Sequence, residues 1–230
     1  MTEAKAESGD RSVQPPVQDI IVIAAPRSGT NFFCECMGTL SGVAAYFEIF
    51  NPGGVMGAGD PRTLEHLSKV LGRPVNSAKE SELVRFFRTQ PLAAVEELRA
   101  CAREHGEVAV CYKVFPGQIP DDALRSLLMR PEAIVAMVVR RRLDTYISYQ
   151  NARRDNVWKN RDTSNLFPSI DLEDFLSWAE RVDSWYEDAA ALARSAERPI
   201  CIFDYDQDIN VPNPALVANL ASQLKRLDPH

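Results

Sequence analysis

The sequence has no long apolar run, and this absence limits where the protein can reside. No segment approaches the roughly 20 apolar residues that a helix needs to cross a bilayer. Residues 1–18 are polar, carry charges of both signs and include Pro15 and Pro16, so they lack the apolar core of a signal peptide. We expect a disordered leader over residues 1–18, a single domain over residues 19–230, and a cytoplasmic protein with no transmembrane segment.

Histidine and cysteine are scarce and show no metal-ligand spacing. The three histidines and five cysteines are His66, His105, His230, Cys34, Cys36, Cys101, Cys111 and Cys201. An odd number of scattered cysteines favours reduced thiols over a disulfide framework. Cys34 and Cys36 lie two residues apart in a helical pattern and therefore point away from each other. We expect no metal site.

An overall excess of positive charge is also absent. The chain has 26 basic and 32 acidic residues, which give a net charge of −6 and argue against a general nucleic-acid-binding protein. Residues 140–161 depart from this average, since they hold seven basic and two acidic residues. Such a local excess indicates a polyanionic ligand, although a solvated helix face would produce the same pattern.

What the sequence does contain is an alternation of strand and helix patterns. Apolar runs typical of buried strands lie at residues 20–25, 107–115, 133–139 and 199–205. Helical patterns begin at residue 30 and recur at residues 61–71, 77–89, 91–105, 121–129, 143–155, 171–195 and 213–224. This alternation predicts an α/β protein in which a central parallel sheet is covered by helices on both faces, a three-layer αβα fold.

The turn after the first strand is the strongest local signal. Pro26-Arg27-Ser28-Gly29 ends the apolar run, and the helical pattern starts at Thr30. The N–H groups in the first turn of a helix have no intrahelical partner, so this turn predicts an anion site to which Arg27 adds a full positive charge. The turn lacks the Gly-Lys-Ser/Thr ending of nucleoside-triphosphatase loops. A plain strand-to-helix turn with a surface arginine remains an alternative.

Three more charged residues stand out. Lys113 and Arg140 lie at the carboxyl ends of two predicted strands, where α/β proteins bind their ligands. Lys113 is either functional or a strand lysine whose amine reaches the surface. Glu48 lies in an apolar run, where a carboxylate is paired, exposed at an edge, or functional. The glycine-rich residues 51–61 after it predict a mobile loop over a site.

Two motifs resemble those of sulfotransferases. Pro26-Arg27-Ser28-Gly29-Thr30 resembles the loop that holds the 5′-phosphate of the donor 3′-phosphoadenosine 5′-phosphosulfate (PAPS). Arg140, eight residues before Ser148, is similar to the motif that binds the 3′-phosphate. The segments FEIFN, CYKVFPGQI and IFDYDQD also resemble bacterial carbohydrate sulfotransferases of the trehalose and Nod-factor type. This resemblance implies a P-loop-like sulfotransferase fold, with PAPS as donor co-substrate and no metal.

The resemblance also implies the role of each site residue. Glu48 is the expected general base, while Arg27 and Lys113 stabilise negative charge during transfer. The expected donor-binding residues are Arg27, Ser28, Gly29, Thr30, Asn31, Arg140 and Ser148. The acceptor is expected to be a hydroxyl of a carbohydrate or glycolipid, in a site shaped by residues 51–61 and 160–170. The sequence leaves open whether the chain forms a homodimer.

Two alternatives remain from the sequence. A P-loop-like nucleotide kinase would need a Lys-Ser/Thr pair after the loop and a carboxylate for Mg²⁺ at a strand end. A non-catalytic nucleotide-binding protein could have the same fold. The chain also ends without the glycine-rich basic segment with which many sulfotransferases close over the nucleotide. Either Arg141, Arg153 or Arg154 replaces that segment, or the affinity for the donor is reduced.

Overall fold

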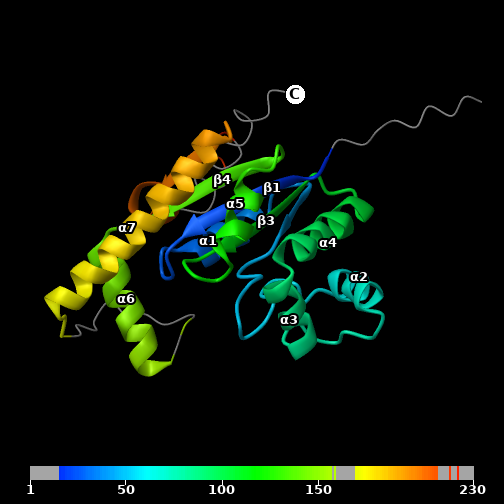
Figure 1. Ribbon diagram of the computed structural model, residues 1–230, viewed down its shortest axis with the longest axis horizontal. Helices are drawn as coiled ribbons and strands as arrows, with labels where there is room; N and C mark the ends of the chain where they lie inside the picture. Colours follow the sequence, from blue (N-terminus) through cyan, green and yellow to red (C-terminus); the bar gives the residue numbers. More distant parts are fainter. Residues whose placement is uncertain (1–15, 157, 159–168, 212–217, 219–221, 223–230) are drawn as a thin grey trace, which may run out of the picture.

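The computed structural model describes residues 16–156, 158, 169–211, 218 and 222. Its centre is a sheet of five parallel strands in the order β2-β3-β1-β4-β5, as Figure 1 shows in part. The strands are β1 (Gln18–Ala24), β2 (Val43–Ala45), β3 (Ala109–Val114), β4 (Ala133–Val139) and β5 (Ile200–Asp204). The strand that leads into the predicted anion turn, β1, is therefore the middle one.

Helices cover both faces of this sheet, which confirms the predicted three-layer αβα fold. They are α1 (Thr30–Met37), α2 (Pro61–Leu71), α3 (Ser81–Thr89), α4 (Pro91–Glu104), α5 (Asp121–Leu128), α6 (Arg142–Asp155), α7 (Leu172–Ser195) and the π-helical turn η1 (Tyr205–Ile209). In Figure 1, α2, α3 and α4 gather at one side of the molecule and α6 and α7 at the other.

The side chains of β1 alternate between two separate cores. Ile21 and Ile23 face the core that α4, α5 and α7 share, whereas Ile20 and Val22 face the core formed with α1 and η1. All four side chains are buried, at most 2% exposed. A strand that is buried on both faces reads as a continuous apolar run, which explains why the sequence predicts β1 so clearly.

The structure adjusts several predicted boundaries. Val17 is buried and β1 begins at Gln18, so the fold includes the last two residues of the predicted leader, while residues 1–15 lie outside the described part. The helix predicted from residue 77 begins at Ser81, because the N–H groups of Asn76 and Ser77 donate to Oε1 of Glu80 instead of starting a helix. Most of the predicted loop 160–170 and of the closing helix 213–224 lies outside the described residues.

Two further expectations concern the cysteines and the membrane-spanning helices. All five cysteines are free and buried, as their scattered positions predict. Among the described residues, no helix combines the length and apolar character that a membrane crossing requires.

A buried ion cluster closes the amino edge of the sheet. The carboxylate of Asp19 is fully buried, with Oδ2 3.1 Å from Nη1 of Arg130 and 3.8 Å from Nη1 of Arg99. Arg99 also donates two hydrogen bonds to the carbonyl of Val17, from Nε at 3.1 Å and from Nη2 at 2.8 Å. Burial raises the pKa of Asp19, and the two guanidinium groups act against that rise. This cluster fastens the start of β1 to α4.

Candidate functional site

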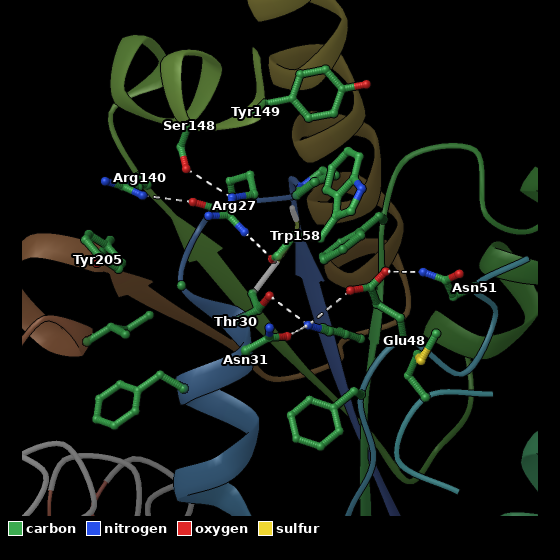
Figure 2. A pocket seen from close by; sticks show the side chains of 18 of the residues that line it. Arg27, Thr30, Asn31, Glu48, Asn51, Arg140, Ser148, Tyr149, Trp158 and Tyr205 are labelled. Carbon is green, nitrogen blue, oxygen red and sulfur yellow. Dashed lines mark hydrogen bonds and ion pairs between the residues drawn. The ribbon is translucent and has the colours of Figure 1, made fainter. Parts of the chain in front are cut away.

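A cavity of about 1100 Å³ opens at the carboxyl edge of the sheet (Figure 2). Its lining includes eight residues that the sequence analysis assigned to a site, namely Arg27, Gly29, Thr30, Asn31, Glu48, Lys113, Arg140 and Ser148. Ser28 is the exception, because its side chain is fully buried beneath the turn and does not line the cavity.

The turn between β1 and α1 has an unusual backbone. Arg27 and Gly29 both have positive φ angles, 72° and 84°. Position 29 requires glycine for two reasons. Its positive φ angle strains any residue with a side chain, and a Cβ there would lie 2.4 Å from the ring of Tyr205. Thr30 and Asn31 line the cavity, so the start of α1 lies at its edge, and no acidic side chain occupies the first helical turn. The turn therefore has the features of an anion site.

Tyr186 of α7 holds this turn in place. Its hydroxyl accepts a hydrogen bond from the N–H of Ala25 at 2.8 Å and donates one to the carbonyl of Val138 at 2.6 Å. The hydroxyl thus joins the ends of β1 and β4 where the two strands lead into the cavity. The sequence predicts a helix over residues 171–195 but gives no signal for this polar contact.

Arg27 connects the two predicted phosphate motifs. Its Nε donates to Oγ of Ser148 at 3.0 Å, and its Nη1 donates to the carbonyl of Trp158. Its own carbonyl accepts a hydrogen bond of 2.9 Å from Nη1 of Arg140. Burial, and then the charge of Arg140, lower the pKa of Arg27. Segments more than a hundred residues apart in the sequence therefore meet at one positively charged position (Figure 2).

The three consecutive arginines after β4 point in different directions. The guanidinium of Arg140 lies 4.2 Å from the ring centre of Tyr205, and its Nε is buried without a hydrogen-bond partner in the described residues. Arg141 is exposed, and Arg142 pairs with Asp183 at 2.6 Å. Only Arg140 of the three lines the cavity, in agreement with the spacing to Ser148.

Lys113 is buried at the centre of the site. Its side chain is 1% exposed, so the alternative of an amine that reaches the surface is wrong. Nζ donates to Oγ1 of Thr30 at 3.3 Å and to Oδ1 of Asn31, and it lies 3.4 Å from Oε1 of Glu48. One ammonium group therefore contacts both the anion turn and the predicted base.

Glu48 is paired rather than exposed at an edge. Besides Lys113, its partner is Asn51, whose Nδ2 donates to Oε2 of Glu48 at 2.8 Å. The Oδ1 of Asn51 accepts a hydrogen bond from the N–H of Gly53 at 2.8 Å, which fixes the orientation of the amide. The side chain of Glu48 keeps 21% of its surface exposed, so a ligand can reach it. The sequence analysis missed Asn51, although Asn-Pro-Gly-Gly is a pattern in which Asn commonly bonds to the backbone two residues on.

The glycine-rich residues after Glu48 form a fixed wall of the cavity, not the mobile loop that their composition predicts. Backbone hydrogen bonds join Phe47 N to Met56 O at 3.0 Å, Met56 N to Glu48 O at 3.2 Å and Val55 N to Ala78 O at 2.8 Å. Val55 and Ala58 are fully buried. The loop is ordered because its apolar residues belong to the core, a feature that glycine content alone does not reveal.

Several lining residues were not among the predicted site residues. They are aromatic or apolar residues and one asparagine from α6, η1 and the segments after them, namely Tyr149, Trp158, Tyr205, Ile209, Asn210 and Val211. The arginines expected to replace a C-terminal nucleotide clamp, Arg141, Arg153 and Arg154, are exposed and do not line the cavity. Within the described residues, no group of three or more His, Cys, Asp and Glu side chains is arranged to hold a metal ion.

Comparisons with known proteins do not assign the chain to a family. No protein-family model matches it, and a search of curated proteins finds no match. Among solved structures, an unliganded sugar kinase from Janibacter sp. aligns with 93% of this chain and 97% of its own, with 13% identity and a TM-score of 0.39. A likeness this weak supports no argument about fold or activity, so the function has to be argued from the site.

Proposed function

We propose that this protein is a sulfotransferase that moves a sulfuryl group from PAPS to an acceptor hydroxyl. The observation that carries the proposal is the meeting of two cationic motifs in one cavity. Arg140 donates to the carbonyl of Arg27 at 2.9 Å, and Arg27 donates to Ser148 at 3.0 Å. PAPS has phosphate groups at both the 5′ and 3′ positions of one ribose, so it needs two anion sites at short separation.

The donors available in the cavity fit such a nucleotide. The first turn of α1 contains no acidic residue, and Nε of Arg140 is buried without a partner in the described part of the chain. The turn Arg27–Asn31 would hold the 5′ side. Arg140 and Ser148 would hold the 3′-phosphate, because a guanidinium fork and a hydroxyl match its oxygens.

The residues around the turn supply the remaining chemistry. Bound PAPS would provide an activated sulfuryl group, and Glu48 would accept the proton that the acceptor hydroxyl loses. Lys113 lies within hydrogen-bond reach of the turn and 3.4 Å from Glu48, so it can stabilise charge where donor and acceptor meet. Arg27 would stabilise the leaving phosphate. The resemblance to trehalose and Nod-factor type enzymes favours a hydroxyl of a carbohydrate or glycolipid as the acceptor.

Calorimetric titration with 3′,5′-adenosine bisphosphate tests the proposal directly. We expect binding that Arg140→Ala weakens by about 10- to 100-fold, because a charge-assisted contact contributes roughly 1.5–3 kcal/mol. Arg141→Ala is the matched control and should bind normally, since the neighbouring Arg141 is exposed and pairs with Asp144 at 3.0 Å. Preference for ATP with Mg²⁺ would instead favour a nucleotide kinase. Nucleotide binding without sulfuryl transfer to any hydroxyl acceptor would favour a non-catalytic protein.

A further inference from the structure

The ring of Tyr205 contacts both predicted phosphate motifs. The central carbon of the Arg140 guanidinium lies over this ring, 4.2 Å from the ring centre. The same ring packs against the backbone of Gly29, since a Cβ there would be 2.4 Å from two ring atoms, Cδ2 and Cε2. Tyr205 and Arg140 both line the cavity, on the side away from Glu48 in Figure 2. One aromatic side chain therefore joins the anion turn to the arginine of the second motif.

The π-helical turn η1, which carries Tyr205, is held by its own acidic side chains. Oδ1 of Asp204 accepts hydrogen bonds from the N–H groups of Asp206 at 2.9 Å and Gln207 at 3.1 Å. Oδ2 of Asp208 accepts a hydrogen bond of 2.8 Å from the N–H of Asp204. Single turns of π-helix recur at functional sites in proteins. The acidic segment IFDYDQD therefore fixes the backbone on both sides of the Tyr205 ring.

An aromatic ring can orient a guanidinium without using any of its hydrogen-bond donors. The N–H groups of arginine point outward in the plane of the guanidinium, whereas the ring occupies its face. Nη1 of Arg140 donates to the carbonyl of Arg27 at 2.9 Å, so a hydrogen bond at the edge and the Tyr205 ring on the face together fix this plane. The N–H groups of Arg140 thereby keep one direction relative to the anion turn.

We propose that Tyr205 is a positioning residue that makes the site selective for a nucleotide with phosphates at both the 5′ and the 3′ position. The inference rests on the proposed function, in which the turn Arg27–Asn31 holds the 5′ side and Arg140 holds the 3′-phosphate. Tyr205 sets the orientation of Arg140 relative to the turn, and with it the spacing of the two anion sites. A nucleotide with a 5′-phosphate alone does not use Arg140 and gains nothing from this arrangement.

Two nucleotides that differ only in the 3′-phosphate provide the test. Calorimetry gives the dissociation constants of adenosine 5′-phosphate and of 3′,5′-adenosine bisphosphate, and the first divided by the second is the discrimination ratio. Tyr205→Leu should lower this ratio about 3- to 30-fold, the range expected when one cation–π contact is lost. Any weakening at the 5′ side cancels in the ratio, because both nucleotides carry the 5′-phosphate.

Further variants separate positioning from direct contact with the nucleotide. Tyr205→Phe keeps the ring and should retain the discrimination ratio. In an Arg140→Ala background, Tyr205→Leu should not lower the ratio further, because the ring then has no guanidinium to orient. Gln207→Ala is the control, since Gln207 is exposed on the same turn and does not line the cavity. If Tyr205→Leu fails to fold, Tyr205→Met fills the space without an aromatic face and Arg140→Lys keeps the charge without the planar group, and both should lower the ratio.

The outcomes separate the role of Tyr205 from the proposed function. An unchanged discrimination ratio in whichever of Tyr205→Leu, Tyr205→Met and Arg140→Lys folds overturns the positioning role and leaves the proposed sulfuryl transfer standing. An equal loss with and without Arg140 means that the ring acts on the nucleotide directly, and this result overturns the positioning role as well. A chain that binds no 3′,5′-adenosine bisphosphate overturns the proposed function, and the role of Tyr205 with it.

Discussion

The two edges of the central sheet both bury charged side chains, but they do so in opposite ways. At the amino edge, Asp19 lies between two guanidinium groups, and Glu96 and Glu132 complete a cluster with more acids than bases. At the carboxyl edge, Arg27, Lys113 and Arg140 line an open cavity together with Glu35 and Glu48.

The difference lies in where the charges find their partners. Arg99 is 6% exposed, and its donors go to protein groups, including the carbonyl of Val17. Arg140 in contrast has a buried Nε without a partner among the described residues, beside an open cavity. At the amino edge only Oδ1 of Asp19 has no hydrogen-bond partner among the described residues, and it is enclosed in the protein. Charge that is enclosed and paired inside the protein supports the fold, whereas charge beside a cavity is available to a ligand. Substitutions at the two edges should therefore affect different measurements.

The largest effect should come from Glu48 at the carboxyl edge. Glu48→Gln removes the proposed base and should lower sulfuryl transfer by about 100- to 10,000-fold, while the affinity for 3′,5′-adenosine bisphosphate stays close to normal. Glu35→Gln is the matched control, because Glu35 lines the same cavity without a salt bridge to Lys113. Near-normal turnover by Glu48→Gln would remove Glu48 from the mechanism.

At the amino edge, we expect a substitution to lower stability and to leave nucleotide binding unchanged. Arg99→Ala leaves the carboxylate of Asp19 and the carbonyl of Val17 short of donors and should lower the free energy of unfolding by about 3–5 kcal/mol. Urea unfolding measures the loss, and the nucleotide affinity of the folded fraction should not change. Arg103→Ala, at an exposed position on the same helix, should unfold like the wild type. Weaker nucleotide binding in folded Arg99→Ala would mean that the two edges are not independent.

An intermediate effect is expected at the anion turn. Gly29→Ala places a Cβ 2.4 Å from the ring of Tyr205 at a φ angle of 84°. The left-handed conformation alone costs an L-residue roughly 1–2 kcal/mol, so we expect nucleotide affinity to fall by about tenfold or more. Gly59→Ala is the control, since its Cβ would meet no atom within 4 Å. Equal affinity in both variants would show that the turn does not bind the nucleotide.

The smallest effect should appear at Asn51, which orients Glu48 without contacting the donor. Asn51→Ala removes one hydrogen bond to a carboxylate and should lower kcat by about tenfold. The affinity for 3′,5′-adenosine bisphosphate should stay the same, because Asn51 lies on the Glu48 side of the cavity (Figure 2). A change in nucleotide affinity with an unchanged kcat would contradict this positioning role.

The sequence was sufficient for features that depend on local patterns. The middle strands β1, β3 and β4 are apolar on both faces, so composition alone predicts them, whereas β2 has three residues and no comparable pattern. The spacing between Arg140 and Ser148 selects the one of three adjacent arginines that lines the cavity. Contacts between distant segments could not be predicted in this way. The bond from Tyr186 to Ala25 and the packing of Tyr205 on Gly29 depend on the assembled core.

The position of Lys113 has a consequence for how the protein could change its substrate. Lys113 belongs to an inner strand, β3, and ties Glu48 to the turn at Thr30, whereas Pro52 and Met56, which also line the cavity, come from a loop. The ion pair of Lys113 with Glu48 is thus anchored in the sheet, and on the proposed function a loop carries part of the lining that would meet the acceptor. Exchange of the Pro52 and Met56 side chains could therefore change the acceptor without moving Lys113, whereas Val55 between them is fully buried and belongs to the core.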